Sequence, residues 1–132
     1  MNKEDNFKEK FKEALISTVK VISDDYKLEK GEHNNFNSKN FSFIELDNLN
    51  SKEDYVKLRA ETDSEALKRK FSNNNIYKKN LPSNTSCKLL YGISEKIRYE
   101  VLGTKMLNGI SKNLKDNYSR KILLKKKDQL KS

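Results

Sequence analysis

Apolar residues recur at steps of three and four through the second half of the chain, and this pattern restricts the fold more than any other feature. The repeat comprises Ile93, Ile97, Val101, Leu102, Met106, Leu107, Ile110, Leu114 and Tyr118. It extends over about seven turns, which predicts one long helix with a single buried face. Pro82 suits the first turn of that helix, because its missing amide hydrogen is no loss there.

Two glycines, Gly103 and Gly109, interrupt this stretch. A glycine inside a helix costs about 1 kcal/mol relative to alanine, so its presence needs a reason. The usual reason is that another segment of the chain comes close. We therefore predict close packing at both glycines. Glu95 and Arg98, three residues apart on the same helix, are placed to face each other.

Two further amphipathic helices are expected earlier in the chain. The first runs from about Glu4 to Ser23 and ends at Asp24. The second begins at Ser51, whose side chain can accept a hydrogen bond from the amide of Asp54, and runs to about Phe71. Their apolar faces contain Phe7, Phe11, Leu15, Thr18 and Ile22 in the first, and Tyr55, Leu58, Thr62, Ala66, Leu67 and Phe71 in the second. Residues 73–80 are expected to form a loop.

The segment between these two helices alternates polar and apolar residues over short distances. One alternation covers Tyr26 to Glu29, Gly31 follows as a turn residue, and a second alternation runs from Phe41 to Leu46. We predict two short strands, arranged as a hairpin with a long loop. The predicted fold is predominantly α (α+β), with three main helices, the last one long, and a small β hairpin between helices 1 and 2.

Three patterns occur in a fixed order along the chain. They are Phe11-Lys12-x-Ala14-Leu15-x-x-Thr18 followed by Ile22 and Asp24, then Arg59-Ala60-x-x-Asp63-x-x-Ala66-Leu67-Lys68, and then Glu95-x-x-Arg98-x-Glu100-x-x-Gly103-x-x-Met106-x-x-Gly109-x-x-x-Asn113-Leu114. Together with Leu81-Pro82, this set resembles the N-terminal region of the T subunit of aerobic, ATP-dependent cobaltochelatase. That enzyme inserts cobalt into the corrin ring during cobalamin synthesis. A His-Asp pair that is usual in the family is replaced here by Phe71-Ser72.

The resemblance spans roughly Phe7 to Tyr118 and implies that the chain works inside a larger assembly. The implied partners are an AAA+ ATPase subunit and a large subunit that holds the corrin and the cobalt. The complex is expected to use ATP, magnesium and cobalt, with no cofactor bound by this chain. In this reading the chain is a docking module with a rigid surface. The polar positions expected to bind partners are Arg59, Asp63, Glu95, Arg98, Glu100 and Asn113.

In that family the N-terminal region is followed by an acidic linker and a von Willebrand factor A-type domain with a metal-ion-dependent adhesion motif. No Asp-x-Ser-x-Ser sequence occurs here. We therefore expect a fragment, a truncated product or a stand-alone module, with no metal bound directly. Residues 1–120 are expected to form one helical domain, and residues 121–132 a basic tail or the stub of a linker.

The sequence lacks the motifs of an enzyme that acts alone. It has no glycine-rich phosphate loop, no HExxH, no paired cysteines and no Gly-x-Ser-x-Gly. Glu95 and Glu100 lie five positions apart, on different faces of one helix, and cannot act as an acid/base pair. His33 has no second ligand nearby and is expected to be solvated. Cys87 has no neighbouring histidine and is expected to be a small buried apolar residue.

The formal charge of +9 leaves a second class of function open, a small basic nucleic-acid-binding domain. Lysines greatly outnumber arginines, however, and readers of bases and phosphates favour the bidentate fork of arginine. A helical structural module without a partner is a third possibility. We find no signal peptide and no apolar run long enough to cross a bilayer, and expect a cytoplasmic protein.

Overall fold

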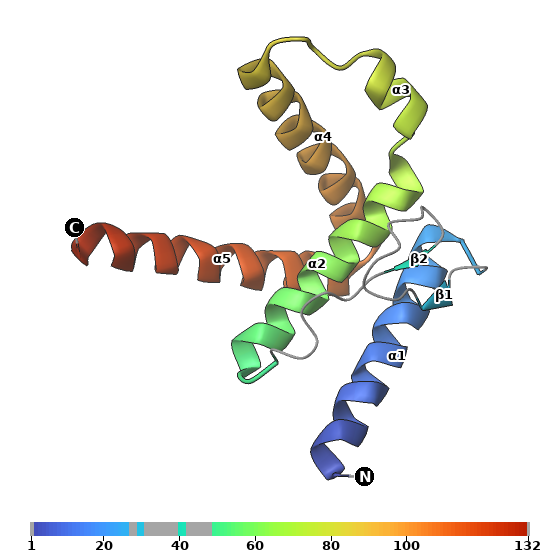
Figure 1. Ribbon diagram of the computed structural model, residues 1–132, viewed down its shortest axis with the longest axis vertical. Coiled ribbons are helices and arrows are strands. Elements are labelled where there is room, and N and C mark those ends of the chain that lie inside the picture. Colours follow the sequence, from blue (N-terminus) through green and yellow to red (C-terminus); the bar gives the residue numbers. More distant parts are fainter. Residues whose placement is uncertain (1, 27–28, 31–39, 42–48, 132) are drawn as a thin grey trace.

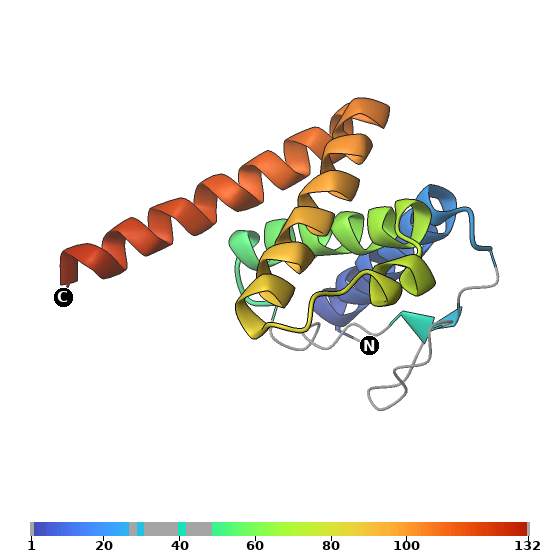
Figure 2. The same ribbon diagram turned by 90° about the horizontal axis from the view of Figure 1, so that it is seen from above.

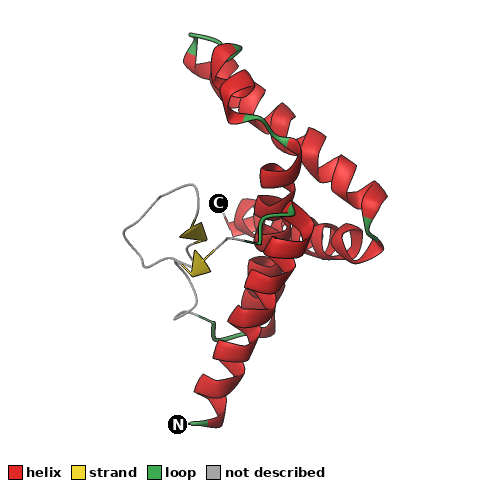
Figure 3. Ribbon diagram, turned by 90° about the vertical axis from the view of Figure 1, so that its right-hand side faces the viewer, coloured by secondary structure: helices red, strands yellow, loops and turns green. Residues whose placement is uncertain are grey.

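The structure is a computed structural model and describes residues 2–26, 29–30, 40–41 and 49–131. Within these ranges the chain forms five helices and two very short strands. The elements are α1 (Lys3–Ser23), β1 (Glu29–Lys30), β2 (Asn40–Phe41), α2 (Lys52–Phe71), α3 (Asn74–Lys79), α4 (Thr85–Met106) and α5 (Asn108–Lys131). Figure 3 shows how small a part of the described chain lies outside the helices.

The ends of the first two helices follow their local signals. α1 stops at Ser23, and Asp24 takes the left-handed backbone conformation that terminates many helices. At the start of α2 the Ser51 hydroxyl accepts a hydrogen bond from the amide of Asp54 at 3.3 Å. The Asp54 carboxylate in turn accepts one from the amide of Ser51 at 3.0 Å. This capping box confirms the predicted start of the helix.

α2 lies at the centre of the molecule and packs against α1, α4 and α5 (Figure 1). α2 can take this central position because its sequence places small and apolar residues on two of its faces. Buried apolar residues of the core are Leu15, Val19 and Ile22 of α1, Leu49, Ala60, Ala66 and Leu67 at or on α2, Tyr99 of α4, and Ile110 and Leu114 of α5. Phe11, Tyr55, Leu58 and Phe71 pack at its edge. The second helix thus supplies the surface on which the other three assemble.

The predicted β hairpin is wrong. β1 and β2 are two residues each and pair in parallel, with Glu29 opposite Asn40 and Lys30 opposite Phe41. Consecutive strands of a hairpin run antiparallel, so this ladder is a different arrangement. It is also too short to form a layer of the fold. His33, Phe43 and Leu46 lie outside the described residues.

The prediction of three main helices is also wrong, for two local reasons. Asn73 caps an additional short helix, α3, by accepting hydrogen bonds from the amides of Asn75 and Ile76. The expected long helix is divided at Leu107, whose backbone is extended (φ −139°, ψ 122°). From this break α4 and α5 diverge, as Figures 1 and 2 show. α5 then continues to Lys131, so the basic residues 121–131 are helical.

The long apolar repeat is not one buried face. Ile110 and Leu114 lie in the core, but Ile93, Ile97 and Val101 are exposed. α4 instead turns Tyr99, Glu100 and Gly103 toward α2. Cys87, expected to be buried, is exposed as well. The periodicity therefore identified helical structure correctly while assigning the wrong face of α4 to the core.

Candidate docking site

A cluster of polar side chains joins α2, α4 and α5, and we call it the polar seam: Asp63, Ser64, Glu100, Asn113 and Tyr118. Glu100 is only 6% exposed and lies at its centre. One carboxylate oxygen accepts a hydrogen bond from the Ser64 hydroxyl at 2.6 Å, and the other accepts one from the Tyr118 hydroxyl at 2.6 Å. The Lys96 amine lies 3.9 Å from the same carboxylate. A buried carboxylate held in this way fixes three helices relative to one another.

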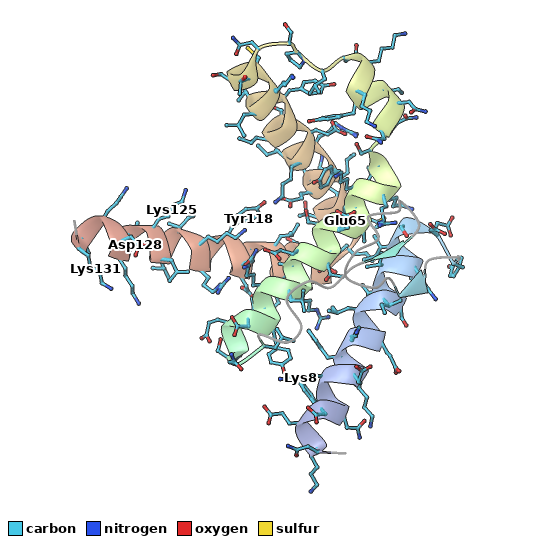
Figure 4. All side chains as sticks on the ribbon, viewed as in Figure 1. Lys8, Glu65, Tyr118, Lys125, Asp128 and Lys131 are labelled. Atoms are coloured by element: carbon cyan, nitrogen blue, oxygen red, sulfur yellow. The ribbon has the colours of Figure 1, made fainter. Side chains whose placement is uncertain are left out.

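The surroundings of Tyr118 favour its neutral, hydrogen-bond-donating form. Burial, and then the hydrogen bond to the Glu100 carboxylate, raise the pKa of Tyr118 well above its usual value. Its hydroxyl therefore remains a donor to Glu100 rather than a second negative charge beside it. Figure 4 shows Tyr118 projecting from α5, some distance along the helix from its break with α4.

Asp63 forms the second part of the polar seam. Asp63 is 2% exposed, and its carboxylate accepts a hydrogen bond from the Asn113 amide at 2.7 Å. Burial raises the pKa of Asp63, although the Asn113 hydrogen bond and the charge of Arg59 both act to lower it. The desolvation of the charged form is therefore the dominant effect.

The raised pKa of Asp63 has a definite consequence for stability. The folded state binds the Asp63 proton more tightly than the unfolded state, so this group contributes less stability as pH rises from 3.8 through its folded pKa. Asp63→Asn removes this loss of stability, because the asparagine side chain carries no charge at any of these pH values. Its amide oxygen can still accept the hydrogen bond from Asn113. We expect the variant to gain stability relative to the parent between pH 3.5 and pH 7. Urea unfolding at both pH values measures this, with exposed Asp116→Asn as control; equal behaviour of the two variants would contradict it.

A second polar contact lies at the end of α2. The Arg98 guanidinium donates to both oxygens of the Glu95 carboxylate, at 2.9 and 2.6 Å, and to the backbone carbonyl of Phe71 at 2.7 Å. The Ser72 hydroxyl donates to Glu95 at 2.9 Å. The hydrogen bonds from Arg98 lower the pKa of Glu95, and those to Glu95 raise the pKa of Arg98. The pair predicted from its spacing therefore also ties α4 to the end of α2.

Five of the six polar residues predicted to bind partners thus take part in contacts within the chain. Asp63 and Glu100 turn their carboxylates inward, and little of either side chain is accessible. Arg59 and Arg98 remain exposed. Sequence reasoning missed Ser64, Ser72 and Tyr118, because each meets its carboxylate across 18 or more residues of chain and spacing carries no signal for such contacts.

Gly103 and Gly109 differ in how closely other atoms approach them. Gly103 is buried, and a β-carbon built there would collide with the side chain of Leu67, which is itself fully buried in α2. At Gly109 a β-carbon would meet nothing within 4 Å. Close packing thus occurs at Gly103, against a side chain of α2 rather than against backbone. The same prediction is wrong at Gly109, because the break at Leu107 places that glycine on an exposed surface.

The side of α4 opposite the core carries a continuous apolar surface, which we call the α4 face: Leu90, Ile93, Ile97 and Val101. These residues are 65%, 49%, 56% and 45% exposed. Their spacing of three and four places them on one side of the helix. Since the other side of α4 is fixed by Glu100 and Arg98, this face is presented outward on a rigid support.

A cleft of about 410 Å³ lies between α2, α3 and α4. Its walls include Lys68 and Arg69 of α2, Tyr77 of α3, and Glu95 and Lys96 of α4. Across the described ranges, no group of three or more histidine, cysteine, aspartate or glutamate side chains is placed to hold a metal ion. Among the helices described, none has the length and apolar character needed to span a membrane.

Comparison with known proteins decides the family. The chain matches the family described as cobalamin biosynthesis protein CobT over residues 5–132. The chain belongs to the CobT family. The match covers nearly the whole sequence and confirms the resemblance found in the three ordered patterns. Searches of curated proteins and of solved structures found no match.

Membership of the CobT family assigns the chain a role in cobalamin biosynthesis. In this CobT-family chain, five residues of the third pattern now have a physical explanation, whereas Met106 and Gly109 are exposed. Glu95 and Arg98 tie α4 to the end of α2, Glu100 and Asn113 hold the polar seam, and Gly103 admits Leu67. The pattern therefore encodes the attachment of α4 and α5 to α2.

Proposed function

We propose that this chain is a docking subunit of an ATP-dependent cobaltochelatase, which inserts cobalt into a corrin ring. Its partners in the proposal are an AAA+ ATPase subunit and a large subunit that binds the corrin. Cobalt is the substrate of the assembly, and ATP and magnesium belong to the ATPase subunit. Family membership supports the pathway, and the α4 face supports the docking role.

The observation that carries the proposal is the contrast between the two sides of α4. One side is fixed to α2 and α5 by the polar seam and by the Glu95–Arg98 contact. The other side exposes four large apolar residues in a row, the α4 face. Soluble proteins that expose a continuous apolar surface of this kind mostly use it to bind another molecule. A rigid helix with an exposed apolar side is the form of a docking element.

Co-purification tests the proposal directly. The tagged chain, expressed with the ATPase subunit and the large subunit of the same organism, should retain at least one of them. It should also be required for cobalt insertion by the reconstituted subunits. If neither subunit is retained and cobalt insertion proceeds without the chain, the proposal is wrong.

Arg98→Ala tests the role of the α4 support. Loss of the contacts to Glu95 and to the Phe71 carbonyl should loosen α4 and weaken subunit association, on the order of tenfold in Kd. The chain should still fold, because an exposed ion pair contributes less than about 1 kcal/mol. Lys88→Ala, an exposed change on the same helix, is the control. Circular dichroism shows whether each variant folds, and the pull-down measures how much partner subunit it retains. If the Arg98→Ala and Lys88→Ala chains retain equal amounts of partner subunit, Arg98 has no role in docking.

A further inference from the structure

The α4 face has the geometry of a surface that receives a helix. Its four residues follow the spacing i, i+3, i+7 and i+11, so they lie along about three turns, on the order of 16 Å. An amphipathic helix laid against such a row presents its own apolar residues at the same intervals. No described element of the chain covers the row, as its exposed fractions show. The occupant therefore comes from outside the described structure.

α5 supplies a second wall with a strong positive charge. It diverges from α4 at Leu107 (Figure 1). The Tyr118 hydroxyl connects the two helices by its hydrogen bond to the Glu100 carboxylate. One turn beyond Tyr118, Ile122 is 55% exposed. α5 contains eight lysines and arginines against two aspartates, and so carries most of the net charge of +9. Lys121 lies over the Tyr118 ring, and Lys125 follows one turn later.

We infer that the α4 face and the Tyr118–Lys125 segment of α5 together bind an acidic amphipathic helix of a partner protein. The inference rests on the proposed docking function and names the chemistry of the partner. Apolar residues of the partner helix would cover Ile93 and Ile97, and its carboxylates would meet the lysines of α5. The apolar row provides the contact area, and the charges select the partner and speed its association.

Charge argues against the two simplest alternatives. A second copy of the chain would bring another strongly basic α5 to the same surface, and the like charges would repel. A nucleic acid would satisfy the lysines but would leave the α4 face exposed to water. An acidic amphipathic helix satisfies both features at once.

A synthetic helix tests the inference on the full chain. The probe is an 18-residue peptide of about five turns, with leucines at steps of three and four and glutamates elsewhere. One comparison peptide replaces the glutamates by lysines, and another replaces the leucines by serines. Titration into the isotope-labelled chain should shift the amide signals of residues 90–101 and 118–125. The acidic peptide should bind at least tenfold more tightly than either comparison, and increasing salt should weaken its binding.

Two sets of variants locate the site. Ile93→Glu with Ile97→Glu should reduce the affinity for the acidic peptide at least tenfold. The matched control is Val21→Glu with Ile76→Glu, two exposed apolar residues of α1 and α3, which should leave the affinity unchanged. Replacing Lys121 and Lys125 by glutamine should weaken binding severalfold and flatten its salt dependence. The same change at Lys78 and Lys79 of α3 should leave both the affinity and its salt dependence unchanged.

Several results would overturn the inference: equal affinity for the lysine peptide, amide shifts confined to other residues, a dimer in sedimentation, or tighter binding of duplex DNA or anionic vesicles.

Failure of the docking function can be distinguished from failure of this inference. If the parent chain retains the ATPase or large subunit, and the Ile93/Ile97 double variant retains it equally, docking stands and this surface is wrong. If the parent chain retains neither subunit, the docking function fails whatever the peptide does.

Discussion

Glu100→Ala is expected to lower the free energy of unfolding by about 2–3 kcal/mol. The substitution removes the acceptor of two hydrogen bonds, from the buried Ser64 hydroxyl and from the Tyr118 hydroxyl. A buried donor left without a partner carries the full penalty of its desolvation, whereas the net gain from one hydrogen bond is smaller. α5 should loosen first, because Tyr118 is one of the contacts that hold it to α4.

Urea unfolding followed by circular dichroism measures this effect. Glu61→Ala, the same change at an exposed position of α2, should alter stability by less than about 0.5 kcal/mol. Glu100→Gln retains an oxygen acceptor and should fall between the two. If Glu100→Ala and Glu61→Ala unfold at the same urea concentration, the polar seam does not stabilise the fold.

Gly103→Ala is expected to destabilise the chain by about 1–3 kcal/mol. Helix propensity alone favours alanine by about 1 kcal/mol, so a loss of stability here must come from packing. The added β-carbon would occupy the space of the Leu67 side chain, and Leu67 is fully buried with no open space on the surface to move into. Either Leu67 or the whole of α4 must shift.

Gly109→Ala is the matched control, because it is the same substitution in open space. It should leave stability unchanged or raise it by up to about 1 kcal/mol. In a Leu67→Ala background, Gly103→Ala should cease to be harmful, although Leu67→Ala alone costs about 2–5 kcal/mol. Changes of the same sign at both glycines would show that the contact with Leu67 is unimportant. Thermal and urea unfolding of the four variants measures these differences.

Local signals account for the parts of the fold that were predicted well. The Ser51 cap with Asp54 three residues later, and the end of α1 before Asp24, depend only on neighbouring residues. The break at Leu107 has a local signal too, the turn-forming pair Asn108-Gly109, but the apolar repeat continues across this pair and indicated one unbroken helix. Which face of α4 is buried depends on α2 and α5, and periodicity reports only that one face is apolar. The repeat therefore combined core residues such as Ile110 with exposed ones such as Ile97.

The candidate site, like the fold, contains one contact that the sequence predicted and others that it could not predict. Spacing predicted the contact between Glu95 and Arg98, because both residues lie on one helix. It could not predict that Asn113 meets Asp63 across 50 residues of chain. Those two residues were selected by the family resemblance alone. The α4 face was visible in the sequence but was assigned to the core, since an apolar row looks the same whether it is covered by its own chain or by a partner.

Leu107 makes the angle between α4 and α5 unusually sensitive to chain length. Its amide still bonds to the Gly103 carbonyl, and its own carbonyl accepts from the Ser111 amide, so the two helices share one residue without a linker. Inserting a single residue inside the first turn of α5 would rotate every later residue of that helix by about 100° about its axis. Ile110 and Leu114 would then turn away from α2, and Tyr118 would lose its hydrogen bond to Glu100. Loops between helices commonly tolerate insertions, but at this junction no residue is spare, and length variation should be confined to other connections.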